Sequence, residues 1–192
     1  LKLGGRPVEQ DIESVQKVWE TVGYNARLAA DGNRGFTIVQ TMTLDRQCAN
    51  VPFILEQPCN TIAEVATLRG RLVHPVYLDE NTEDLNVVLT AVGTGIADGF
   101  GFKITRLGGL SKIAVARDIC AIRSLPHTCD DAWGGDIIAA AGAHIGSTVE
   151  PSRFEGAWIA QEYLEGHYDS RNPIDIEDGQ IRVPTGPGLG VD

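Results

Sequence analysis

The sequence predicts an α/β protein with a parallel sheet, organised as a TIM-type (β/α) barrel domain. Short apolar runs alternate with segments of helical periodicity along most of the chain. Such alternation places parallel strands beside crossover helices. A polar residue closes each apolar run, and these residues recur every 23 to 29 positions. Units of near-uniform length favour a barrel, whose active site gathers residues from the carboxyl ends of its strands.

The elements follow from the apolar pattern, taken in chain order. One stripe of a helix at 8–22 is formed by Val8, Ile12, Val15, Val18, Trp19 and Val22. Further helices are expected at 37–48, 61–69, 84–92, 111–123 and 135–145, and strands around Lys2 and at 27–31, 52–57, 75–80, 99–105 and 127–131. Thr61 and Glu64 have the spacing of a capping box. Residues 175–192 are expected to form a polar hairpin and a turn-rich tail without chemistry.

An open nucleotide-binding sheet is the main alternative fold. It requires a glycine-rich turn between its first strand and the following helix. The nearest stretch, GTGIADG at 93–99, has the wrong spacing and precedes a strand, so we interpret it as a turn. The glycine pairs at 108–109 and 134–135 follow strands, where they fit either a tight turn or a phosphate.

Composition narrows the classes of partner. The 192 residues, 43% of them hydrophobic, include 16 basic and 26 acidic side chains, a net charge of −10. An acidic protein repels nucleic acids and anionic membranes, so neither is expected as a partner. The most apolar stretch, 136–149, is too short to cross a bilayer. Four cysteines without a Cys-x-x-Cys pair suggest neither a zinc site nor a disulfide framework, which favours a reducing cytoplasm.

Three carboxylates close consecutive strands, namely Asp31, Glu56 and Asp79. Brought to one mouth of a barrel, they would repel one another unless a cation lay between them. Oxygen ligands in this number suit Mg²⁺. The alternative is that each acid pairs with a nearby base, such as Arg34, Arg71 or Arg106. Spacing alone leaves both interpretations open.

Two lysines, Lys2 and Lys103, close the strands before and after the three acids. A lysine close to a divalent cation and to a second lysine, and shielded from water, has a lowered pKa and acts as a neutral base. Solvated surface lysines are the alternative. Lys103 lies within the apolar run GFGFKIT, which favours a functional role for it.

The ordered motifs LKLGG, AADGNRG, ILEQPC, YLDE and GFKITRLGG cover essentially the whole chain. Together they resemble the barrel domain of the enolase superfamily, in its mandelate racemase and muconate lactonizing enzyme branch. Such sites pair a Lys or His base with Mg²⁺ that stabilises an ene-diolate. The resemblance implies that Asp31, Glu56 and Asp79 hold Mg²⁺ and that Lys2 and Lys103 are the two opposing bases. The other lysine of the family's Lys-x-Lys strand would precede Leu1.

This resemblance implies removal of the α-proton of a small carboxylate substrate. Return of a proton by the opposite lysine would invert the carbon, which is racemisation or epimerisation. Loss of a β-hydroxyl group would be dehydration. Members of the family are often oligomeric, which implies a homo-oligomer.

The stretches LPHTCDDAWGGD, EGAW and GPGLG resemble the branch that acts on proline betaines and hydroxyprolines, which includes 4-hydroxyproline betaine 2-epimerases and cis-3-hydroxyproline dehydratases. A quaternary ammonium group donates no hydrogen bond, so an aromatic face suits it, and Trp158 is the candidate. Asp130 is expected to help hold the cationic nitrogen. Ordinary packing is the alternative role for Trp133 and Trp158.

The chain departs from the family pattern in two ways. The α+β capping domain and the first barrel strand are not found, so we interpret 1–192 as a partial barrel domain and the carboxyl part of a longer protein. Two other hypotheses stay open. A Schiff-base aldolase would use Lys103 covalently but gives the three acids no purpose. A barrel fragment without activity would only bind or assemble.

Overall fold

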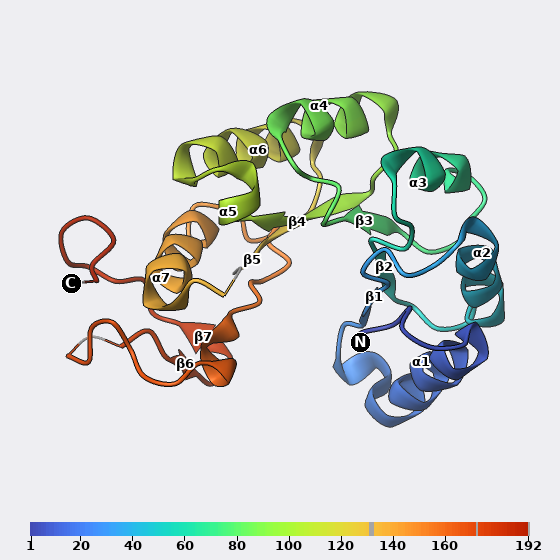
Figure 1. Ribbon diagram of the computed structural model, residues 1–192, viewed down its shortest axis with the longest axis horizontal. Coiled ribbons are helices and arrows are strands. Elements are labelled where there is room, and N and C mark those ends of the chain that lie inside the picture. The colour runs from blue at the N-terminus through green and yellow to red at the C-terminus, as the bar shows by residue number, and fades with distance from the viewer. Residues whose placement is uncertain (131–132, 172, 192) are drawn as a thin grey trace. The chain divides into compact units, whose positions relative to one another are not determined.

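The structure is a computed structural model that describes residues 1–130, 133–171 and 173–191. The chain forms two compact units. The first comprises Leu1–Asn81 and Thr90–Gly99, and the second comprises Thr82–Leu89 and Phe100–Asp192. Helix α4 (Leu85–Thr94) supplies residues to both. Within the first unit β1 pairs with β2 and β2 with β3, and within the second β4 pairs with β5, all in parallel (Figure 1).

The first unit is built on the parallel strands β1 (Ala29–Asp31), β2 (Ile54–Glu56) and β3 (Val76–Leu78). Its helices are α1 (Val8–Val22), η1 (Gly23–Asn25), α2 (Ile38–Gln47) and α3 (Ile62–Leu68). Capping boxes begin two of these helices, Thr37 with Gln40 at α2 and Thr61 with Glu64 at α3. Each box satisfies two backbone N–H groups at a helix start and so fixes where the helix begins after its strand.

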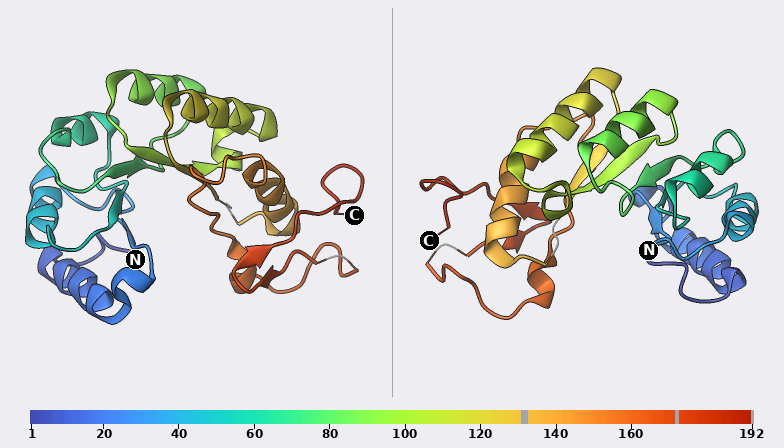
Figure 2. Two further views of the ribbon diagram at one scale, coloured as in Figure 1. Left: turned by 180° about the vertical axis from the view of Figure 1, so that it is seen from behind. Right: turned by 45° about the horizontal axis from the view of Figure 1, so that its top comes forward.

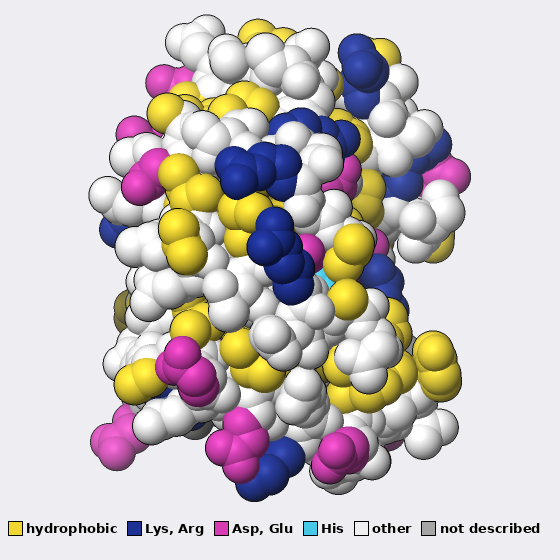
Figure 3. Space-filling view, turned by 90° about the vertical axis from the view of Figure 1, so that its right-hand side faces the viewer, with side chains coloured by type: hydrophobic (Ala, Val, Ile, Leu, Met, Phe, Trp, Pro, Cys, Tyr) yellow, Lys and Arg dark blue, Asp and Glu magenta, His cyan; other side chains and the backbone are white. Residues whose placement is uncertain are grey.

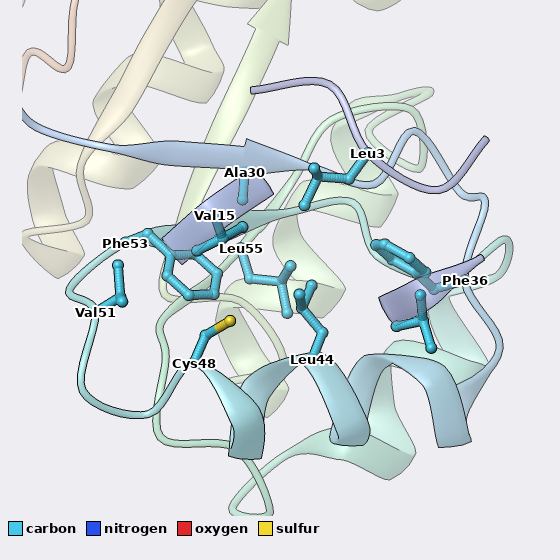
Figure 4. Packing of buried hydrophobic residues seen from close by; sticks show 10 residues of the cluster. Leu3, Val15, Ala30, Phe36, Leu44, Cys48, Val51, Phe53 and Leu55 are labelled. Carbon is cyan, nitrogen blue, oxygen red and sulfur yellow. The ribbon is translucent and has the colours of Figure 1, made fainter. Parts of the chain in front are cut away.

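The core of the first unit lies between its strands and helices. Leu44 of α2 and Cys48, which follows the end of that helix, point toward Leu55 of β2 and neighbouring Phe53, and all four are buried (Figure 4). Val15 of α1 joins this cluster. Burying such side chains contributes about 1.5–3 kcal/mol each, which anchors the strands whose ends carry the acids.

The second unit contains the parallel pair β4 (Gly99–Lys103), apart from its first residue, and β5 (His127–Asp130). Its helices are α5 (Ile104–Leu107), α6 (Leu110–Arg123), α7 (Gly135–Gly146) and η2 (Ala160–Tyr163). The antiparallel strands β6 (Ile176–Glu177) and β7 (Gln180–Ile181) form the expected hairpin. Figure 2 shows from two further directions that α6 and α7 lie on the same side of β4 and β5.

The predicted alternation of strands and helices is confirmed, with differences at the boundaries. The strands are shorter than expected, and the strand predicted to reach residue 105 gives way to α5 at Ile104. The segment around Lys2 forms a single parallel bridge to Asp31 instead of a strand, and Phe154 makes a similar bridge to His127. Asp131, the last residue of the strand expected at 127–131, lies outside the described residues.

The face shown in Figure 3 carries charged and apolar side chains, and the cysteine thiols are buried. On the face in Figure 3, acidic and basic side chains are interspersed with apolar ones. Among the described residues, none of the helices has both the length and the apolar character needed to span a bilayer. All four cysteines are free and buried. Burial raises the pKa of Cys120 and of Cys129 to about 12, so these thiols stay protonated at neutral pH.

Candidate metal centre and the neighbouring strand ends

Three carboxylates converge at the carboxyl end of the sheet in the first unit. Asp31 and Glu56 are the last residues of β1 and β2 and are register partners. Asp79 directly follows β3. One oxygen from each of the three carboxylates lies within 4.8 Å of the others. The prediction that strand ends bring these acids together is therefore confirmed.

The donor set fits a divalent cation. Asp31 and Asp79 are buried and Glu56 is half-buried, so water screens their mutual repulsion poorly. Ligand oxygens around one octahedral Mg²⁺ lie roughly 3 to 4 Å apart. A small inward movement of the three side chains would reach this spacing. Carboxylate oxygens are the ligands that Mg²⁺ prefers, and fewer than six protein ligands leave positions for water or substrate.

Lys2 contacts this acidic group directly. Its Nζ donates a hydrogen bond to Asp31 Oδ2 at 2.5 Å. This lysine is therefore a basic partner of Asp31. Desolvation lowers the pKa of Lys2, but the hydrogen bond and the charges of the three acids outweigh it and raise the pKa overall. The Lys2 side chain is 75% exposed, so the shielding from water under which a lowered pKa was expected is not found in the described chain.

The backbone holds the Lys2 segment against β1. Leu3 N–H donates to Asp31 O at 2.8 Å, and Asp31 N–H donates to Leu1 O at 2.9 Å. The approach is close enough that a Cβ atom added to Gly35 would lie 2.5 Å from Gly4 O. Only glycine fits there, which explains Gly4 of LKLGG and Gly35 of AADGNRG in terms of packing beside the site.

A buried amide connects the ends of β2 and β3. Gln57 Oε1 accepts hydrogen bonds from the backbone N–H groups of Asp79 at 3.0 Å and Asn81 at 3.1 Å. Its Nε2 donates to Cys59 O at 3.0 Å and to Asn81 Oδ1 at 2.6 Å. All of its side-chain hydrogen-bonding groups are thus used. Gln57 thereby fixes the backbone of Asp79 relative to Glu56.

A second cluster of predicted residues lies in the second unit. Lys103 and Asp130 end β4 and β5 and are register partners. Asp130 is buried, and its Oδ1 accepts the backbone N–H of Trp158 at 2.8 Å. The hydroxyl of Thr128 donates to Asp130 Oδ2 at 2.7 Å. Trp133 and Trp158 are 60% and 42% exposed, and their rings contact each other, so both the binding role and the packing role stay open for them.

Sequence reasoning missed the side chains that support the site. Gln57 lies inside the motif ILEQPC, but it also bonds to Asp79 and Asn81, which lie 22 and 24 positions away in the chain. Asp11 was also missed: it is fully buried and accepts bonds from Gly4 N–H at 2.9 Å and from the Arg6 side chain at 2.6 Å. A polar residue beside the apolar stripe of a helix was the one available signal for Asp11.

Comparison with known proteins places the chain in a family. Residues 1–192 match the enolase C-terminal domain-like family, and the chain belongs to it. Cis-3-hydroxy-L-proline dehydratase of Roseibium aggregatum is 30% identical over 198 residues, which cover 100% of this chain and 52% of that protein. N-succinylamino acid racemase of Amycolatopsis is 28% identical over 186 residues, covering 94% and 49%. The chain spans about half the length of these curated relatives.

Solved structures agree with this assignment. A Silicibacter pomeroyi protein assigned to the mandelate racemase/muconate lactonizing enzymes has a TM-score of 0.95 and 28% identity, covering 100% of this chain and 53% of its own. An enolase-superfamily member from Roseovarius nubinhibens, solved in complex with magnesium, has a TM-score of 0.93 and 25% identity, covering 100% and 52%. The predicted enolase superfamily, its mandelate racemase and muconate lactonizing enzyme branch, and the barrel-type fold are confirmed.

Proposed function

We propose that this chain supplies the metal site and proton-transfer residues of an enzyme that racemises or epimerises a proline betaine or hydroxyproline betaine. The observation that carries the proposal is the group formed by Asp31, Glu56 and Asp79 at the strand ends. Mg²⁺ bound there would supply positive charge that stabilises the negative charge developing on the substrate carboxylate. The proposal extends to 1–192 as one partial barrel domain of a longer, cytoplasmic and homo-oligomeric protein.

The side chains of this chain have distinct roles in the proposal. Asp31, Glu56 and Asp79 hold the cation and so orient the substrate carboxylate. Lys2 and Lys103 exchange protons with the α-carbon, one as base and the other as acid. Asp130 and Trp158 hold the cationic nitrogen of the substrate. Despite desolvation, the pKa of Lys2 is raised because its hydrogen bond to Asp31 and the charges of the three acids act on it without a cation between them. A cation bound by the acids would add positive charge and so lower the pKa of Lys2.

Dehydration of cis-3-hydroxy-L-proline is the second candidate. It is favoured by the 30% identity to a cis-3-hydroxy-L-proline dehydratase over the whole of this chain. Both reactions begin with removal of the α-proton and differ in the second step. A proton returns to the carbon in racemisation, whereas the β-hydroxyl leaves as water in dehydration. The same lysine pair serves either outcome.

The test is α-proton exchange in D₂O, followed by NMR, using the natural protein that contains this sequence together with Mg²⁺. Hydroxyproline betaine and cis-3-hydroxy-L-proline are supplied in separate experiments, and Lys2→Ala and Lys103→Ala are compared with wild type. Betaine epimerisation that needs both lysines is the expected result. Elimination of water from cis-3-hydroxy-L-proline without betaine exchange would favour the second candidate.

Other outcomes separate the remaining hypotheses. A protein that binds Mg²⁺ but exchanges neither α-proton would retain the metal site and contradict the substrate class. Borohydride trapping of a carbonyl substrate on Lys103 would support an aldolase. Absence of Mg²⁺ binding would support a fragment without activity.

A further inference from the structure

Three aromatic rings form an exposed cluster in the second unit. Trp133 and Trp158 have ring centroids 5.4 Å apart at an interplanar angle of 64°. Tyr163 lies 5.6 Å from Trp133 and 6.2 Å from Trp158, measured between ring centroids. We call Trp133, Trp158 and Tyr163 the aromatic triad. Its rings come from the loop after β5, the segment before η2 and the end of η2.

Two features of the aromatic triad are unfavourable for the free energy of folding. Trp133 is 60% exposed and Tyr163 is 66% exposed, although large aromatic rings gain most from burial. Trp133 also adopts a left-handed backbone conformation with φ of 64°. A bulky residue in that region is strained by about 1–3 kcal/mol, and such strain concentrates at ligand-binding positions. Exposure together with strain indicates a binding surface.

Charge beside the triad indicates the kind of ligand. The buried carboxylate of Asp130 accepts the backbone N–H of Trp158, so a negative charge lies next to this residue. The faces of aromatic rings are also electronegative and attract cations within about 6 Å of a ring centroid. Because adjacent centroids lie 5.4 to 6.2 Å apart, a cation over the cluster is within reach of more than one ring.

We propose that Trp133 and Tyr163 join Trp158 in binding a quaternary ammonium group, and that they set the preference for an N-methylated over an unmethylated proline-type substrate. A primary or secondary ammonium group would lose hydrogen bonds to water against ring faces, whereas a quaternary one has none to lose. The inference rests on the proposed function, because it takes this ligand to be the substrate of the same protein. Lys103, the register partner of Asp130, ends the neighbouring strand.

The test measures binding of choline and of its uncharged carbon analogue, 3,3-dimethylbutan-1-ol, to the full chain without Mg²⁺. The chain has three tryptophans, and Trp19→Phe leaves the two in the triad as the fluorescent reporters. Choline is expected to bind more tightly than its analogue. Trp133→Leu and Tyr163→Leu are each expected to weaken choline binding roughly two- to five-fold while changing binding of the analogue less.

Conservative variants keep the test decisive. Trp133→Phe and Tyr163→Phe retain a ring and are expected to keep most of the preference for choline. Tyr24→Leu removes an aromatic ring that is 91% exposed in the other unit and is expected to change nothing. Equal binding of choline and its analogue, or unchanged choline binding in both Leu variants, would overturn the inference. Neither result bears on Mg²⁺ binding or proton exchange, which test the proposed function separately.

Discussion

At the scale of the residue, Gln57 is the support on which the position of Asp79 depends. It is fully buried, and its side chain bonds to backbone or side-chain atoms of Cys59, Asp79 and Asn81. Groups that orient a metal ligand without touching the metal typically change metal affinity by 10- to 100-fold when mutated. Gln57 is therefore a positioning residue for the candidate metal centre.

Gln57→Leu is expected to lower the free energy of unfolding by roughly 2–4 kcal/mol, because it leaves the N–H groups of Asp79 and Asn81 without their acceptor. Mg²⁺ affinity should fall roughly tenfold. Urea denaturation and isothermal titration calorimetry measure the two effects. Gln10→Leu makes the same change at an exposed position and should leave both values nearly unaltered. Unchanged Mg²⁺ affinity in Gln57→Leu would show that Gln57 does not position the ligands.

The contact between Gly4 and Gly35 allows a second prediction. In Gly35→Ala the new Cβ would lie 2.5 Å from Gly4 O, so the backbone beside Lys2 must shift. A loss of about 1–3 kcal/mol in unfolding free energy is expected from this overpacking. Gly5→Ala is the matched control, since its Cβ meets no atom within 4 Å. Thermal denaturation compares the two variants, and equal losses would refute the packing explanation.

The strand-end acids could be predicted from the sequence because the carboxyl ends of parallel strands meet at one edge. The buried polar contacts could not. Asp45 of α2 accepts hydrogen bonds from the N–H groups of Val73 and His74 and pairs with the His74 ring at 2.7 Å. These partners lie 28 and 29 positions away in the chain, and only the packing of α2 against the segment before β3 brings them together.

At the scale of the element, hydrogen bonds connect the first turn of α7 to η2 and to the segment that follows it. Asp136 is buried there and accepts hydrogen bonds from the Gln161 side chain at 2.8 Å, the His167 ring at 2.9 Å and the Tyr168 N–H at 2.6 Å. The second ring nitrogen of His167 lies 3.6 Å from Asp175 Oδ1. Two carboxylates thus face one imidazole ring.

This arrangement makes stability depend on pH. The hydrogen bond from His167 to Asp136 raises the pKa of His167, and the charges of Asp136 and Asp175 add to the effect. Because its pKa is raised on folding, the His167 contact contributes fully to stability at pH values below the pKa of an unfolded histidine, about 6.5. This contribution is lost as the pH rises through the pKa of His167 in the folded protein. Burial tends to raise the pKa of Asp136, but its hydrogen bonds from His167 and Tyr168 lower it overall, so its contribution is lost only in acid.

We therefore expect the stability difference between wild type and His167→Gln to be largest near pH 6 and to shrink toward pH 8.5. Urea denaturation across this range measures it. The difference between the two proteins removes the effect of other histidines, such as His127, whose pKa is lowered by burial. A difference that does not change with pH would show that His167 is uncharged in this contact.

Helices and their starts were the elements most accessible to prediction. The capping box of Thr61 and Glu64 was predicted from spacing and is present. Strand ends were predicted less well, because apolar character continues past the last paired residue, as at Ile104, where α5 begins. The aromatic triad was beyond prediction, since Trp158 precedes η2, Tyr163 ends it five residues later, and no period relates the two.

At the scale of the whole molecule, the order of motifs predicted the family, and the match over residues 1–192 confirms it. No single motif sufficed, because each is short. The regular spacing of these motifs at the strand ends indicated the family, because a barrel repeats its βα unit. The family alone does not determine the substrate, because relatives that share this domain include both a dehydratase and a racemase.

The central claim is that Asp31, Glu56 and Asp79 together hold one divalent cation. Calorimetric titration of the chain with Mg²⁺ tests it most directly, with Glu56→Gln as the site variant and Glu20→Gln as a control at an exposed position. We predict one Mg²⁺ per chain in wild type and in Glu20→Gln, and at least a tenfold loss of affinity in Glu56→Gln. Failure of wild type to bind Mg²⁺, or equal binding by Glu56→Gln, would contradict the account.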